Sequence, residues 1–527
     1  MKRKIISIII TLLIGALVFY IFLPSLNIHS FNFWVFIMFL ILVYSIIADY
    51  KGLFNYPRIG IRKEKIKFTP FILVPIIVIG IIVLDLIGSP IFNAKKYAKR
   101  ITIDETQSFA ENIKPVDFTK LPLLDKDSSQ KLGDRVMGQM SELVSQFNVS
   151  DIYTQINYND SIIRVTPLEY ASFVKWLTNK KDGVKGYITV NSVNGEANLI
   201  KLDKGMKYLP SAHFNKNLNR KLRFDYPTCN FGRVSFEIDN EGNPYWIVPV
   251  ISYKFVGLRA EVTDLIILNP FDGTSKKMKI NEVPSWVDMA YSADLIIEQV
   301  NDWGNYKNGF FNSIFGQKSV VNTTDGYNYL AMDDDIYLYT GITSIVADES
   351  NLGFILTNMR TKETAFYKAP GAEEYSAMAS AEGAVQQMKY TSTFPLLINL
   401  NNKPTYLVSL KDAAGLVKMY AFIDVEDYQR VVVTDSSKGI EEAANNYLKD
   451  AKFEPDKSVL TNKTITIKSI KDITISGNTY FYLTDENDNK YKVSINVSDN
   501  LPFLKSGSTI KISYASEAEI TNIVRID

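Results

Sequence analysis

Three long apolar stretches near the N-terminus constrain this 527-residue chain more than any other feature of its sequence. They run from Ile5 to Phe22, from Phe31 to Ala48 and from Phe71 to Ile91. Each is close to the ~20 residues that a helix needs to cross the hydrocarbon core of a bilayer. A helix also satisfies its own backbone hydrogen bonds, as a segment in lipid must. The sequence therefore predicts a membrane domain over residues 1–93 with three transmembrane helices.

Basic residues are unevenly placed around these stretches. Residues 1–91 hold nine Lys/Arg and three Asp/Glu, a net charge of +6, whereas the whole chain carries +1. Nine basic residues precede the first stretch or lie between the second and third, and the loop Pro24–Ser30 has none. Because basic loops stay on the cytoplasmic side, we expect a multi-pass protein of the cell membrane with a cytoplasmic N-terminus and an extracellular C-terminal region. Four basic residues at 95–100 oppose this orientation but are outnumbered.

Two features of the apolar stretches have alternative interpretations. The first stretch could be a cleaved signal peptide, because basic residues precede it. Its length, and the lack of a clear small-x-small cleavage site after it, favour a retained helix. Asp85 lies in the third stretch, where a carboxylate is a functional candidate by default. Its position near the outer end, within reach of headgroups or water, favours a side chain without a function in transport.

Cysteine and histidine are scarce, which excludes several kinds of chemistry. The chain has one cysteine, Cys229, and two histidines, His29 and His213. A single cysteine cannot form an intrachain disulfide, and clustered zinc or copper ligands are hardly available. A large exported region without disulfides is typical of bacteria that do not rely on oxidative folding. The net charge of +1 gives no argument for nucleic acid as a partner.

A hairpin pattern recurs beyond the membrane domain. Residues 264–280 form an apolar run that ends in an Asn, a turn and a polar return run. The same plan fits four places, whose end-of-run residues are Asn191, Asn269, Asn358 and Asp424. A second hairpin, whose return strand starts with Pro followed by an early Tyr, occurs at 233–250 (Pro244-Tyr245) and 396–410 (Pro404-Thr405-Tyr406, a Pro-x-Tyr). Helices expected at 284–304 and 373–387 would each cover one face of a strand set.

These patterns predict an α+β fold for the region after the membrane domain. We expect a connector at 94–127 and tandem α+β units at 128–230, 231–345 and 346–450. Inside the first unit, Thr166, Pro167 and Glu169 fit a capping box and predict a helix to about Lys180. Residues 459–527 then hold five short strands separated by turns, which fit a small five-stranded β-barrel that looks like an OB-type barrel.

The order of helix, Pro-x-Tyr strand and apolar strand ending in Asn or Asp resembles PepSY-type domains. The stretches that carry the resemblance are 245–250 with 265–274, and 406–410 with 420–425. The resemblance implies a protein of bacterial membranes or envelopes that inhibits or modulates partner proteins. It implies no catalytic residues, because that family has no catalytic motif.

Two groups of residues are candidate sites. Asp333, Asp334 and Asp335 could supply oxygen ligands to calcium, although their spacing is not that of an EF-hand and a solvated acidic turn would look the same. The aromatic residues that could bind a partner, or else join two domains as core, are Trp303, Tyr306, Phe310 and Phe311. Cys229 and His213 are the one possible Cys/His pair, and no supporting motif makes them a catalytic pair.

The expected function is therefore not enzymatic, with no catalytic residue and no cofactor. We expect an envelope scaffold or regulator that contacts membrane lipid and binds an unknown envelope protein through its extracellular region. A sensor or receptor for a small ligand or a cation such as calcium is the alternative. An envelope hydrolase acting through carboxylates is the third possibility. The sequence leaves open whether the chain forms a homo-oligomer.

Overall fold

The computed structural model describes residues 2–48, 70–139, 141–332, 334–345, 347–450, 461–475, 478–498, 500–514, 520–523 and 525–526. The chain divides into two compact units, which we describe separately. Unit 1 comprises residues 1–106, 120–348 and 353–366. Unit 2 comprises residues 107–119, 349–352 and 367–527. Both units mix helices with antiparallel sheets, which confirms the predicted α+β class.

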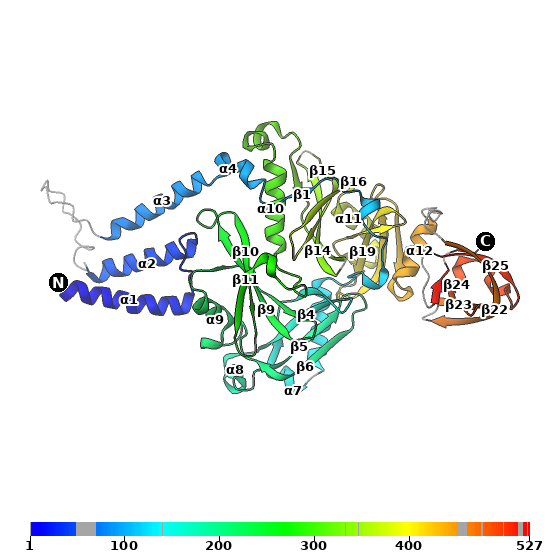
Figure 1. Cartoon of the computed structure of the whole chain (residues 1–527), viewed down its shortest axis with the longest axis horizontal. Coiled ribbons are helices and arrows are strands. Elements are labelled where there is room, and N and C mark those ends of the chain that lie inside the picture. The colour runs from blue at the N-terminus through cyan, green and yellow to red at the C-terminus, as the bar shows by residue number, and fades with distance from the viewer. Residues whose placement is uncertain are drawn as a thin grey trace. The chain divides into compact units, whose positions relative to one another are not determined.

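Unit 1 begins with the apolar helices, drawn in blue in Figure 1. They are α1 (Lys2–Phe22), α2 (Phe31–Ala48) and α3 (Leu73–Ile87), which follows the short η1 (Pro70–Ile72). Within the described residues, three segments are long and apolar enough to cross a membrane: Lys4–Phe22, Phe31–Ala48 and Pro70–Ile87. The predicted spans are thus present as helices. The basic segment between the second and third helices, residues 49–69, lies outside the described residues.

The loop between α1 and α2 is hydrogen-bonded to the folded region that follows α3. The Leu26 amide donates to the Pro227 carbonyl at 2.7 Å, and the Asn27 side chain donates to the Thr228 carbonyl at 2.9 Å. On the other side of the loop, the Gly257 amide donates to the His29 carbonyl at 2.8 Å. The loop and residues 227–257 therefore lie on the same side of the apolar helices.

Among the described residues, four successive sheets share one strand order. In each sheet the first two strands are short, and both pair with the long third strand, each with a different part of it. The third strand also pairs with the fourth, and the fourth pairs with the fifth. We call these strand sets the first to fourth repeats. The first repeat has β2 (Phe147–Val149), β3 (Thr154–Tyr158), β4 (Ser161–Tyr170), β5 (Val184–Asn191) and β6 (Ala197–Met206). The second has β7 (Asn230–Phe231), β8 (Ser235–Ile238), β9 (Pro244–Tyr253), β10 (Ala260–Leu268) and β11 (Ser275–Lys279). The third has β12 (Val321–Thr323), β13 (Asn328–Met332), β14 (Asp335–Ser344), β15 (Ala347–Asn358) and β16 (Thr364–Ala372), and β1 (Ile103–Asp104) pairs with β16 in parallel. The fourth has β17 (Thr391–Ser392), β18 (Leu396–Leu400), β19 (Lys403–Lys411), β20 (Val417–Asp424) and β21 (Val431–Asp435).

The recurring Asn or Asp has the same structural role in every repeat. Each side-chain oxygen accepts hydrogen bonds from backbone amides two or three residues later, which closes the turn after the fourth strand. The Asn191 oxygen accepts from Val193 and Asn194, and the Asn269 oxygen accepts from Phe271. Asn358 and Asp424 make the equivalent bonds. The four end-of-run residues of the sequence pattern therefore close turns.

Helices fill the space between the sheets of unit 1. The second sheet has both faces buried, because strand residues alternate in direction. Trp246 and Val248 pack with the first repeat and α9 (Leu218–Asp225), whereas Ile247 and Ile251 pack with α10 (Ala293–Tyr306) and the third repeat. Figure 1 shows α10 as a long green helix that meets α4 (Pro90–Tyr97).

Three local predictions differ from the structure. Residues 166–169 belong to the strand β4, where Pro167 lies opposite Tyr187, and the helix α8 (Phe173–Asn179) begins only at Phe173. The predicted capping box is therefore wrong, because strand pairing outweighs the local signal. The helix predicted over 284–304 begins later, at Ala293. The boundary expected between 345 and 346 falls inside one sheet, since β15 and β16 continue from β14.

The described part of unit 2 holds the fourth repeat, with α11 (Glu374–Ala384) and α12 (Ile440–Asp450), and a C-terminal sheet. The C-terminal strands are β22 (Thr461–Ile475), β23 (Asn478–Asp485), β24 (Lys490–Ser494), β25 (Thr509–Tyr514), β26 (Ile520–Asn522) and β27 (Arg525–Ile526). The first half of β22 pairs with β25 and the second half with β23, so the sheet curls around one apolar core. The last of the five predicted strands is divided into β26 and β27.

Candidate functional site

A cleft of about 930 Å³ lies between the first and second repeats. Strands β4, β5 and β6 contribute to it from the first repeat. From the second repeat come residues around the β8–β9 and β10–β11 turns. Its lining mixes aromatic, aliphatic, amide and charged groups, among them Tyr158, Tyr187, Tyr245, Phe271, Ile163, Ile200, Asn159, Asn198, Lys201 and Lys204. The cleft can therefore offer both apolar contact and hydrogen bonds to a ligand.

A tyrosine joins the two repeats beneath the cleft. The Tyr187 hydroxyl donates to the Gly242 carbonyl at 2.9 Å, and burial raises the pKa of Tyr187 to about 12. The hydroxyl therefore stays protonated and remains a donor at physiological pH. Gly242 has φ = +82°, a conformation that a residue without Cβ adopts readily. The β8–β9 turn is thus fixed against β5, which gives the cleft a defined width.

One edge of the cleft is the outer side of β6. In the described part of the chain, β6 pairs with β5 alone, so its other backbone edge has no strand beside it. Lys201, Asp203 and Lys204 are exposed along this strand and all three line the cleft. Lysines on an edge strand discourage unspecific strand pairing, but the unpaired amides and carbonyls still allow a matched strand to add.

The charges of the cleft are of both signs. The lining contains three acidic residues, Glu196, Asp203 and Glu241, and two basic residues, Lys201 and Lys204. A calcium site gathers oxygen ligands, and a phosphate site gathers Arg or Lys. The mixed lining suits neither ion and is compatible with a polypeptide, which carries both donors and acceptors.

Several amides in the cleft are committed to turns. Asn191 and Asn269 hold the turns described above, and the Asn243 side chain donates to Asp239 at 3.0 Å. Asn198 bonds Glu196 at 3.0 Å on the rim. The groups of the cleft that are not committed to these turns include the β6 backbone and exposed side chains such as Lys201 and Lys204.

The predicted calcium ligands do not form a common site in the described residues. Asp335 is buried and accepts from Arg360 at 2.8 Å (Nε) and from the Asn358 side chain at 2.8 Å. Asp334 lies in the turn before it with φ = +70°. Asp333 lies outside the described residues, and within them no group of three His, Cys, Asp or Glu could hold a metal. Asp335 thus acts as an ion-pair partner for Arg360.

The predicted aromatic partner site is divided between core and surface. Trp303 is buried in the core that α10 shares with the second and third sheets, and Lys307 lies 4.0 Å above its ring. Tyr306 is half-buried and close to Arg259 and Asp302, and burial raises its pKa. Phe310 is half-buried, whereas Phe311 is exposed. The first two residues therefore join elements of unit 1, and only Phe311 and its neighbours offer an open surface.

Cys229 and His213 have different neighbours. The Cys229 sulfur lies 3.8 Å from the Lys277 nitrogen, and His213 packs on the rings of Phe173 and Trp176. These contacts do not bring the two side chains together.

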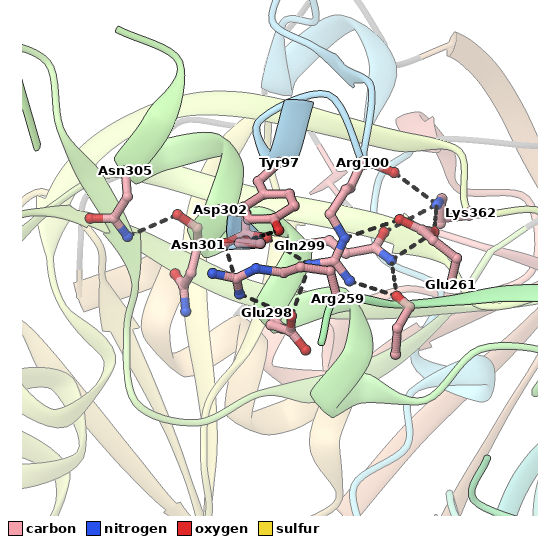
Figure 2. Close-up of polar contacts among 12 residues, drawn as sticks. Tyr97, Arg100, Arg259, Glu261, Glu298, Gln299, Asn301, Asp302, Asn305 and Lys362 are labelled. Atoms are coloured by element: carbon pink, nitrogen blue, oxygen red, sulfur yellow. Dashed lines mark hydrogen bonds and ion pairs between the residues drawn. The ribbon is translucent and has the colours of Figure 1, made fainter. Parts of the chain in front are cut away.

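Sequence reasoning missed a buried charge cluster where α4 meets α10 (Figure 2). Its members, which we call the Arg100 network, are Arg100, Arg259, Glu261, Glu298, Gln299, Asp302 and Lys362. The fully buried Arg100 side chain donates to Glu261 at 3.0 Å, to Glu298 at 2.8 Å and to Asp302 at 2.6 Å. Burial opposes the charge of Arg100, but these bonds outweigh it and raise its pKa. The network fixes the exit of the third apolar helix to the folded region.

A second buried cluster contains two carboxylates that contact no cation within the described residues. We call Glu237 and Asp288 the carboxylate pair. Glu237 accepts from the Asp288 amide at 2.8 Å and from the Ser235 hydroxyl at 2.8 Å, while Asp288 accepts from the Asn157 amide at 2.7 Å. Burial raises the pKa of Glu237 to about 7 and holds that of Asp288 well above its usual range. Only the fold reveals this pair, because the two residues lie in unrelated segments of the sequence.

Comparison with protein-family models, with curated proteins and with solved structures finds no match.

Proposed function

We propose that the chain is a non-enzymatic, membrane-anchored scaffold or regulator of the bacterial cell envelope. In this proposal it binds an extended segment of a partner protein in the cleft between the first and second repeats. The observation that supports it most directly is that β6, which pairs only with β5 within the described residues, contributes residues to the lining of that cleft. An extended peptide that adds to such an edge gains main-chain hydrogen bonds, and side pockets select its alternate side chains.

The lining of the cleft supports a binding role over a catalytic one. Its described lining residues include no His or Cys, so a nucleophile with a histidine base cannot be assembled there. Glu237 and Asp288, whose pKa values are strongly raised, are buried and do not line the cleft. Tyr187 does line it, but its pKa of about 12 keeps the hydroxyl protonated as a donor to Gly242. A lining group with a pKa near 7 would favour catalysis.

The contacts of the α1–α2 loop support the proposed orientation. The loop bonds residues 227–257, so both lie on one side of the apolar helices, and the basic segment 49–69 is expected on the other. Labelling Cys229 with a membrane-impermeant thiol reagent in intact cells, with a denatured control, tests this. Labelling in intact cells is expected, and labelling only after lysis would reverse the orientation.

The finer fold assignments belong to the same proposal. We infer that the repeats are PepSY-like and that residues 459–527 form an OB-type barrel. The shared strand order with its Asn or Asp turns supports the first, and the division of β22 between two partners supports the second. An experimental structure of the C-terminal sheet in which β22 pairs on only one side would contradict the barrel.

Site-specific photo-crosslinking in native membranes tests the partner site. A photoreactive amino acid at Asn198 or Lys201 should capture one partner, whereas the same group at exposed Asp325 of the third repeat should not. Thr189→Arg places a bulky charge in the cleft and should reduce capture at Lys201 at least tenfold. Asp325→Arg is the matched control and should leave capture unchanged. Equal capture at all three positions, or capture that is insensitive to Thr189→Arg, would refute the cleft as the partner site.

A further inference from the structure

A patch of exposed apolar side chains lies on α8 and η3 (Phe214–Lys216), apart from the cleft. The exposed fractions are 46% for Phe173, 61% for Val174, 45% for Leu177 and 56% for Phe214. The ring centroids of Phe173 and Phe214 are 6.4 Å apart, so the two elements form one surface. We call these four residues the α8 patch. A contiguous exposed patch of large apolar side chains marks an interaction site in a folded protein.

The α8 patch is tied to the end of α1. Asn215, next to Phe214, accepts a hydrogen bond from the Tyr20 hydroxyl at 3.4 Å. Arg220 connects the two sides, since its Nε donates to the Tyr20 carbonyl at 3.1 Å and its Nη1 donates to the Phe214 carbonyl at 2.7 Å. Its guanidinium also lies 4.2 Å from the centre of the Tyr20 ring. These bonds hold Phe214 beside the last turn of a helix that is long and apolar enough to cross a bilayer.

The same surface continues onto α9. Phe224 is 53% exposed, and the centre of its ring lies 5.7 Å from that of Phe19 and 6.1 Å from that of Tyr20. Arg223 donates to the Leu23 carbonyl at 3.0 Å. Residues 19–23 are the end of the apolar span, the depth at which aromatic residues gather at a membrane surface. Figure 1 shows α9 against the ends of α1 and α2.

Charge beside the patch is positive. Lys175, Lys180 and Lys181 lie on α8 or directly after it, and Asp182, which follows Lys181, is the one acidic residue between Ser172 and Gly183. The Lys180 ammonium lies 5.4 Å from the centre of the Trp176 ring, which is buried under the patch. Apolar side chains with lysines beside them form the amphipathic surface that lies in a headgroup layer.

We propose that the α8 patch inserts into the bilayer surface around α1, with Phe173, Val174, Leu177 and Phe214 at the boundary of headgroups and acyl chains. The neighbouring lysines then contact anionic headgroups. This arrangement holds the first repeat against the membrane independently of any partner in the cleft. A second copy of the chain is the competing occupant, and the experiment distinguishes the two.

The test uses the full chain with Cys229→Ser in lipid nanodiscs that contain anionic phosphatidylglycerol. A polarity-sensitive fluorophore is attached to Val174→Cys or Phe214→Cys, and to Asn198→Cys in the cleft as the control. At positions 174 and 214 we expect a blue-shifted emission that nitroxide-labelled lipid quenches at least twofold. The label at 198 should remain unquenched.

Three results would overturn the proposal. Emission at 174 and 214 that is neither shifted nor quenched would place the patch in water. A blue shift without lipid quenching, together with a Phe214→Cys disulfide between two chains, would assign the patch to a second copy. Equal quenching at 198 would show that the label itself partitions into lipid. In the Lys180→Glu/Lys181→Glu background we expect weaker quenching in anionic discs, with little change in zwitterionic discs.

Discussion

The Arg100 network and the carboxylate pair are both buried polar clusters in unit 1, but their charges are balanced differently. The network sets three cations, Arg100, Arg259 and Lys362, against three carboxylates. The two carboxylates of the pair accept hydrogen bonds from backbone amides. Among the described residues, no cation is in direct contact with them. The first cluster therefore stays charged when buried, whereas the second lowers its charge by holding a proton near neutral pH. Burial also raises the pKa of Asp302 in the network, so the two clusters differ in how their charge is balanced and in the pH range over which they respond.

The largest effect is expected from Arg100→Met. This change removes the fully buried cation that contacts all three carboxylates. Among the described residues, the buried Asp302 then keeps only Arg259, while the partly exposed Glu298 and Glu261 keep Arg259 and Lys362. Breaking a buried ion pair from one side costs about 3–5 kcal/mol. Hydrogen exchange of the α10 amides should report that loss as a lower local opening free energy. Arg233→Met removes a cation from an exposed pair and should change little. Equal exchange in both variants would show that the network does not hold α10.

The carboxylate pair should make the second repeat less stable as pH rises. The folded-state pKa of Glu237 is about 7, above its ordinary value of 4.5, so its stabilising contribution is complete below pH 4.5 and is lost as pH rises to 7. That loss reaches about 3 kcal/mol. Hydrogen exchange of residues 284–289 between pH 5 and 8, corrected for intrinsic rates, should reveal it.

Glu237→Gln should reduce this pH dependence by removing the contribution of Glu237 and its charge beside Asp288; the contribution from the burial of Asp288 should remain. Asp264→Asn is a control, because the contribution of Asp264 to stability changes with pH in the opposite direction. Burial alone would raise the pKa of Asp264, but bonds from Lys279 and Thr263 lower it, so its contribution is lost as pH falls. A pH slope that is unchanged in Glu237→Gln would assign the effect to another group.

Arg360→Met tests whether the ion pair between Arg360 and Asp335 affects the pKa of Asp288 in the carboxylate pair. Arg360 neutralises Asp335, whose charge contributes to the raised pKa of Asp288. Without Arg360, Asp288 should hold its proton more tightly, and the pH dependence at 284–289 should grow. The buried Asp335 also loses a charged hydrogen bond, which costs about 1–3 kcal/mol. An unaltered pH profile would separate Asp335 from the carboxylate pair.

The smallest effect is expected from Tyr187→Phe. Loss of its 2.9 Å bond to Gly242 should cost about 1 kcal/mol. Because the pKa of Tyr187 is about 12, the effect should be constant between pH 5 and 9. Urea denaturation at the two pH values, followed by tryptophan fluorescence, measures it. A pH-dependent cost would mean that the neighbouring carboxylates, and not the neutral bond, dominate this contact.

Local patterns in the sequence were enough to predict the features that depend on neighbouring residues. The apolar spans and the turn role of Asn269 are examples, since length and a two-residue bond determine them. The strand at Thr166–Pro167 was not predictable, because its pairing with β5 outweighs a local helix signal. The Arg100 network, the cleft and the α8 patch join segments far apart in the chain, and one sequence gives no measure of such contacts.

The short strand β1 has a consequence for the biosynthesis of the protein. Ile103 lies just after the membrane helices, yet its partner in β16 is Thr364, and the Arg100 carbonyl accepts a bond from Lys362, 262 residues later. At a synthesis rate of about 5–20 residues per second, this partner emerges on the order of tens of seconds after β1. During that time residues 103–104 have no strand to join, so a nascent chain is exposed to proteases and wrong pairing at its membrane exit. A chaperone that binds near residues 103–104 would have its greatest effect before residue 364 has been translated.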